Sequence, residues 1–203
     1  LRFPGPASVK PAGEEFVVSF WEPTTVTVGG SSGNRAGPGR ITIEPTPSGL
    51  ATGLTHLAAA HHTTAPVRSH PSFRAHPPLL ELGSETSVPS AVAAETPETG
   101  IEFLVPPELD RLFVAAPLAY YLGATVEVTD CDAPVLRADD PSIRYEFDDL
   151  PGFQHQCAQL LRRAFFLDCQ ARRVAPDRAS SDGLQQLPID LDSLCQLDPA
   201  ARL

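Results

Sequence analysis

The sequence predicts an α/β fold with a mixed sheet, and three patterns favour this class. Short runs of β-branched and aromatic residues are typical of strands. Longer stretches place apolar residues at helical spacing. A strand, a helix and a second strand follow one another within residues 99–128, as in a crossover between parallel strands. With 203 residues, of which 42% are hydrophobic, the chain is long enough to bury a core.

The N-terminal subdomain, residues 1–84, is predicted to be a β-meander with one helix. The runs 16–20, 24–28 and 40–44 are rich in Val, Ile, Thr and Phe, so we expect three strands there.

A helix is predicted from Pro47 to about His61, because leucines recur at helical spacing behind Thr46. The Thr46 side chain can cap the first turn, and proline at the first helical position loses no hydrogen bond. An apolar run at 79–82 predicts a further strand.

Residues 85–99 are rich in Ser, Pro, Ala and Glu and are predicted to link the two halves, with one helical turn at 90–95. The second subdomain is then 100–203.

This second half begins with the crossover unit. Strands are predicted at 101–105 and 125–128, with a helix between them that starts near Pro107. Pro117 is expected to kink the helix or divide it in two, because its ring clashes with the carbonyl four residues earlier. Gly123 is expected to end the helix in a left-handed conformation.

A hairpin and a long helix are predicted to follow the crossover. The hairpin strands are 135–137 and 143–147, and the helix runs through 151–173. A short helix is expected at 190–195.

The net charge of the chain limits which classes of molecule are expected to bind it. The formal net charge is −10, and Lys10 is the only lysine among 15 basic residues. Nucleic acid is therefore excluded as a predicted partner, since binding to phosphates needs clustered positive charge. An acidic chain with arginine in place of lysine is typical of salt-loving archaea, where surface charge is strongly screened.

The predicted compartment is the cytoplasm. No apolar run is long enough to span a bilayer, so no membrane partner is expected. The chain has no methionine, which favours a segment of a longer protein, with the other domains of that chain as partners. Four irregularly spaced cysteines are typical of reduced thiols.

A candidate ligand site consists of Asp130, Cys131 and Asp132, just after the second crossover strand. Open α/β sheets bind ligands at the carboxyl ends of their strands, so Pro106 and Pro107, after the first strand, should lie nearby. The acidic neighbours of the thiol raise its pKa and disfavour it as a nucleophile.

Other patterns predict no catalytic residue, no metal ion and no cofactor. The glycine-rich run 29–39 leads into a strand and lacks a following Lys-Ser or Lys-Thr. Cys157 and Cys169 fall on or near an apolar helical stripe and are expected in the core. Five histidines favour a surface loop over a metal site, since their spacing lacks a ligand motif: His56, His61, His62, His70 and His76.

Three stretches, 64–79, 100–128 and 164–169, resemble an uncharacterised family of haloarchaeal proteins. In that family a segment of this kind precedes a caspase-like CHAT domain, which carries the catalytic His and Cys. The resemblance implies a non-catalytic accessory or recognition domain of a larger cytoplasmic protein, which regulates or targets the peptidase domain.

The alternative is a small-ligand-binding or enzymatic domain with a pocket at the strand edge near Pro106 and Asp130. The sequence leaves open whether this segment is an enzyme and favours a non-catalytic role.

Overall fold

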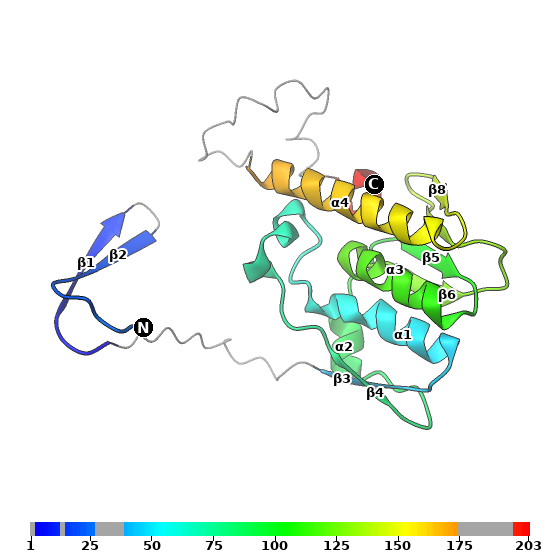
Figure 1. Ribbon diagram of the computed structural model, residues 1–203, viewed down its shortest axis with the longest axis horizontal. Helices are drawn as coiled ribbons and strands as arrows, with labels where there is room; N and C mark the ends of the chain where they lie inside the picture. Colours follow the sequence, from blue (N-terminus) through cyan, green and yellow to red (C-terminus); the bar gives the residue numbers. More distant parts are fainter. Residues whose placement is uncertain (1–2, 13–14, 27–38, 174–196) are drawn as a thin grey trace, which may run out of the picture. The chain divides into compact units, whose positions relative to one another are not determined.

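The computed structural model describes residues 3–12, 15–26, 39–173 and 197–203, which belong to two compact units, 1–37 and 38–203 (Figure 1). The larger unit combines a four-stranded mixed sheet and a two-stranded sheet with packed helices, which confirms the α/β class. None of its described helices is long and apolar enough to cross a membrane.

The smaller unit contains an antiparallel hairpin of β1 (Ala7–Ala12) and β2 (Glu15–Phe20). The strand at 16–20 is confirmed, but the predicted meander is wrong. The partner of β2 is β1, and the described residues 24–26 form no strand. β1 contains Pro11, and proline is unusual within a sheet, so the sequence does not predict this strand. A two-stranded ribbon tolerates proline, because each strand has one edge without a hydrogen-bonding partner.

The larger unit begins with a parallel pair of strands, β3 (Arg40–Ile43) and β4 (Leu79–Leu82). They are joined through α1 (Pro47–Leu57), whose first turn is capped by Thr46: its Oγ1 accepts a hydrogen bond from the Gly49 amide at 3.1 Å. Three single 3₁₀ turns follow α1: η1 (Ala58–Ala60), η2 (Pro66–Ser69) and η3 (Pro71–Phe73).

The four-stranded sheet has the order β6-β5-β7-β8. As predicted, the crossover strands β5 (Ile101–Val105) and β6 (Thr125–Val128) pair in parallel, and β7 (Val135–Ala138) and β8 (Ile143–Glu146) form a hairpin. β7 also pairs with β5, antiparallel, which makes the sheet mixed.

The crossover helix is the single helix α3 (Leu109–Leu122), so the expected division into two helices at Pro117 is wrong, while the alternative of a kink stays a prediction. Pro117 and Phe113 are both exposed, so the hydrogen bond that proline removes belongs to the exposed side of the helix. Gly123 ends the helix with φ of 68°, which confirms the predicted cap.

The long helix is α4 (Gly152–Arg173), as predicted. α3 lies between α1 and α4, and the three helices cover the four-stranded sheet (Figure 1). Phe153 of α4 packs against Phe103 of β5, with ring centroids 6.0 Å apart. A short turn, η4 (Ala200–Arg202), ends the chain, and the helix predicted at 190–195 lies outside the described residues.

One hydrophobic core extends across the predicted linker 85–99. It joins Ile41 to Ile101, and Val92 of the short helix α2 (Ser90–Glu95) is buried in it. The compact units therefore divide after Gly37, whereas the sequence suggests a division across 85–99.

Replacing Pro117 by alanine should stabilise the larger unit, because α3 regains a backbone hydrogen bond and loses a steric clash. We expect Pro117→Ala to raise the free energy of unfolding by about 1–3 kcal/mol in a denaturant titration. Pro107→Ala, outside the helix, is the control and should not raise it, since it only loosens the unfolded chain. An unchanged or lower value for Pro117→Ala would contradict the account of α3.

Candidate functional site

The predicted ligand residues lie at one edge of the four-stranded sheet. The last residues of β5 and β6, Val105 and Val128, are register partners, and the Thr129 amide donates to the Val105 carbonyl at 3.1 Å. Asp130 and Asp132 follow as exposed residues, and Cys131 between them is partly buried.

Pro106, at the end of β5, is buried, and Pro107 is exposed. Among the described residues, no three His, Cys, Asp or Glu side chains are grouped so that they could hold a metal ion. The role of Asp130, Cys131 and Asp132 in ligand binding stays a prediction.

The described cysteines form no disulfide. Cys157 is buried in the core, as predicted, and burial raises the pKa of its thiol to about 12, so that it stays protonated at neutral pH. Cys169 is partly buried. Cys195 lies outside the described residues, as does most of the glycine-rich run.

A buried ionic cluster, which the sequence analysis missed, joins three helical elements around Asp168 of α4. The Arg68 Nε of η2 donates to Asp168 Oδ2 at 2.9 Å, and the Tyr121 hydroxyl of α3 donates to the same oxygen at 2.8 Å. The Arg202 Nε of η4 lies 3.4 Å from the other oxygen, Oδ1. The side chains of Arg68 and Asp168 are each only 3% exposed.

This cluster satisfies its own charges. The Arg68 guanidinium also lies over the Tyr121 ring, 4.7 Å from its centroid. Arg202 additionally donates to the Leu197 carbonyl at 2.7 Å and to the Thr64 carbonyl. Burial raises the pKa of Tyr121, and the adjacent Asp168 carboxylate raises it further, so the phenol remains a donor. Both carboxylate oxygens are engaged, which favours a structural role over a catalytic one.

His61 lies beside this cluster and is buried, which corrects the expectation of a loop of surface histidines; His62, His70 and His76 are exposed. Its Nε2 lies 2.8 Å from the Tyr120 carbonyl oxygen. A carbonyl can only accept, so Nε2 carries the proton.

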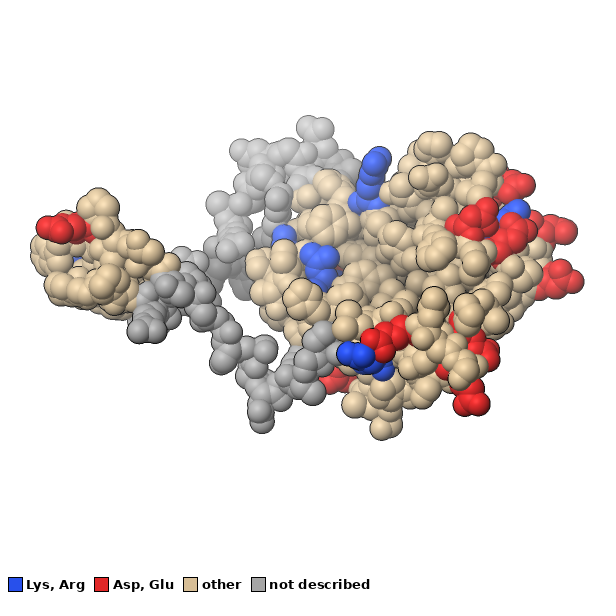
Figure 2. Space-filling model, turned by 60° about the horizontal axis from the view of Figure 1, so that its bottom comes forward, with Lys and Arg blue, Asp and Glu red and all other residues tan. Residues whose placement is uncertain are grey.

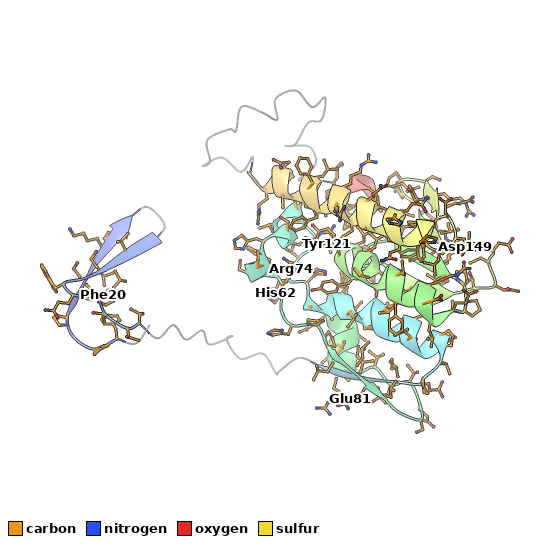
Figure 3. The ribbon with its side chains drawn as sticks, in the orientation of Figure 1. Phe20, His62, Arg74, Glu81, Tyr121 and Asp149 are labelled. Atoms are coloured by element: carbon orange, nitrogen blue, oxygen red, sulfur yellow. The ribbon has the colours of Figure 1, made fainter. Side chains whose placement is uncertain are left out.

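Two further contacts define the environment of His61. Its imidazole stacks on the Tyr120 ring, with centroids 4.6 Å apart. Burial lowers the pKa of His61, and the charges of Arg68 and Arg74 lower it further, so the ring is neutral at physiological pH. Figure 3 shows Arg74 and Tyr121 at the same end of the larger unit.

The signal for the cluster is present in the sequence. Asp168 follows Ala164 by four residues and therefore shares the buried stripe of α4. A carboxylate on an apolar stripe needs a buried cationic partner. The sequence does not say which arginine supplies it, because Arg68 lies 100 residues away.

Comparisons of the chain with protein-family models, with curated proteins and with solved structures give no match.

The buried neutral His61 predicts a fall in stability at acidic pH. Its folded pKa is lower than its unfolded pKa of about 6.5, so its contribution is present above that pH and is lost as the pH falls through the folded pKa. We expect the free energy of unfolding, measured by denaturant titration, to decrease between about pH 7.5 and about pH 5.5.

In His61→Gln, whose amide can still donate to the Tyr120 carbonyl, this decrease should be smaller than in the wild type. The matched control is His155→Gln, which removes an exposed histidine and should keep the wild-type pH dependence. If His61→Gln and the wild type respond equally to pH, His61 is not neutral in the folded state.

Proposed function

We propose that this chain is a non-catalytic accessory domain that recognises another domain of a larger cytoplasmic protein. The observation that carries the proposal is the apolar face of the β1-β2 hairpin. Register alone defines this face, because alternate residues of each strand point to the same side.

The two faces of the hairpin differ in polarity. One face carries apolar pairs across the ribbon: Ala7 with Phe20 and Val9 with Val18. The other carries a polar residue in each pair: Ser8 with Ser19 and Lys10 with Val17. Within the smaller unit, Phe3 meets the edge of Phe20 with ring centroids 4.8 Å apart, while Val9 remains 59% exposed.

A two-stranded ribbon with such a face is at best marginally stable in water, since it buries too little apolar surface to offset the ordering of its backbone. Packing of the apolar face against another domain supplies the missing contacts. The hairpin is therefore a docking element whose order depends on its partner.

The resemblance to the family with a caspase-like CHAT domain supports that domain as the partner. The accessory domain would position or regulate the peptidase, whose own residues carry the catalysis. The ionic cluster at Asp168 fits this role, because its groups hold helices together and leave neither carboxylate oxygen unengaged.

Hydrogen exchange tests the proposal. The amides of β1 and β2 are compared in this chain alone and in the same chain joined to the caspase-like domain that follows it in the family. We expect exchange to be at least about tenfold slower in the joined protein. The double variant Val9→Ser, Val18→Ser should lose this protection, and the control Ser8→Thr, Ser19→Thr, on the polar face, should keep it.

Equal protection of the hairpin in the isolated chain and in the joined protein would contradict the proposal. So would protection in the joined protein that survives the Val9→Ser, Val18→Ser change.

A further inference from the structure

Basic residues are concentrated in two parts of this acidic chain. Residues 45–80 and 150–173 together contain six arginines and all six histidines, and Asp168 is their only acidic residue, although the chain as a whole carries a net charge of −10. The first part contains η2 and η3, and the second part contains α4.

The two parts lie side by side in the larger unit. η2 packs along α4, and Arg68 and Asp168 join them. On the face shown in Figure 2, many acidic side chains of this unit gather at the right-hand end, and several basic side chains on the left-hand half lie apart from them. The one carboxylate between the two parts, that of Asp168, is buried and engaged, so it does not neutralise the surface.

Arginines divide into two groups by their partners. In the described part of the chain, the arginines outside these two stretches each form an ion pair with a carboxylate: Arg40 with Glu81, Arg111 with Glu108 and Asp149, Arg137 with Glu102, Arg144 with Glu146, and Arg202 with Asp168. Arg74, Arg162, Arg163 and Arg172 form no ion pair with a described residue. Within the described part of the chain, no carboxylate therefore pairs with the arginines of α4.

Two of these arginines have a guanidinium nitrogen without a hydrogen-bond acceptor among the described residues. The Nε of Arg74 and an Nη of Arg172 are buried atoms without a hydrogen-bond partner among the described residues. A carboxylate oxygen is the acceptor that guanidinium groups bind best.

An aromatic side chain lies among these arginines. Arg162, Phe165 and Arg172 follow one another at helical spacing on one stripe of α4. Phe165 is 39% exposed and contacts the edge of the Tyr121 ring, with centroids 5.7 Å apart. Arg74 acts electrostatically on the neighbouring Tyr120. We call Arg74, Arg162, Phe165 and Arg172 the basic face.

We propose that the basic face binds an acidic segment of a partner protein, one that combines Asp or Glu with a large apolar residue. The carboxylates pair with the arginines, and the apolar residue covers Phe165; arginine and aromatic residues are the side chains enriched at the centres of protein interfaces. This inference rests on the proposed role in recognition and uses a different surface from the hairpin.

A partner segment of this composition can also bind at high salt. At 1 M salt the Debye length is roughly 3 Å, so the attraction between exposed charges is strongly reduced. Ion pairs that are partly buried beneath an aromatic contact are screened much less. The apolar residue therefore adds affinity and protects the ionic contacts.

Binding is measured by fluorescence anisotropy with a labelled peptide of Asp, Glu, Leu and Phe, added to the full chain. The variant is Arg74→Gln, Arg162→Gln, and the matched control is Arg137→Gln, Arg144→Gln, which removes the same charge elsewhere. We expect the variant to weaken binding about tenfold and the control less than about twofold. Phe165→Ser should weaken binding of this peptide and not of one in which Leu and Phe are replaced by Ser. Circular dichroism confirms that each variant is folded.

Three outcomes would overturn the inference: no binding of the acidic peptide, equal weakening by the variant and the control, or tighter binding of a peptide with Lys in place of Asp and Glu. Preferential binding of a single-stranded oligonucleotide or of inorganic phosphate would also overturn it, by assigning the face to phosphate. Hairpin protection in the joined protein is independent of these results, so failure here leaves the proposed function standing.

Discussion

The larger unit depends on the buried carboxylate of Asp168. Its two oxygens receive Arg68, Tyr121 and Arg202, which come from three elements far apart in the chain. Removing one partner from a buried ion pair costs about 3–5 kcal/mol, because the other charge stays buried without compensation. The positions of η2, α3 and η4 against α4 are therefore interdependent. The same contact buries the one acidic residue in the sequence of α4.

Local patterns in the sequence predict most elements of the larger unit because their causes are local. The cap at Thr46, the αL glycine at Gly123 and the alternation of β5 each depend on a few neighbouring residues. The failures involve long-range partners. The sequence shows a strand at 16–20 but not that β1 pairs with it. It shows Pro117 but not that the helix continues through this residue.

The features of the candidate sites also differ in whether their causes are local or depend on partners far away in the sequence. The strand-end position of Asp130, Cys131 and Asp132 follows from the order of strands, and the structure places them there. The burial of His61 and the pairing of Asp168 with Arg68 could not be predicted, because they require knowledge of which loop covers which helix. The burial of Tyr121 depends on the same long-range packing. The arginines of the basic face have no described ion-pair partner, and this could be identified only from the structure, which gives the partners of the other arginines.

The central claim is that Asp168 and Arg68 hold the fold of the larger unit together. A double-mutant cycle of Arg68→Met and Asp168→Leu, measured by denaturant unfolding, tests it most directly. We expect each single variant to lose about 3–5 kcal/mol and the double variant to lose clearly less than their sum, since it leaves fewer buried charges uncompensated. Additive losses, or single variants as stable as the wild type, would contradict the claim.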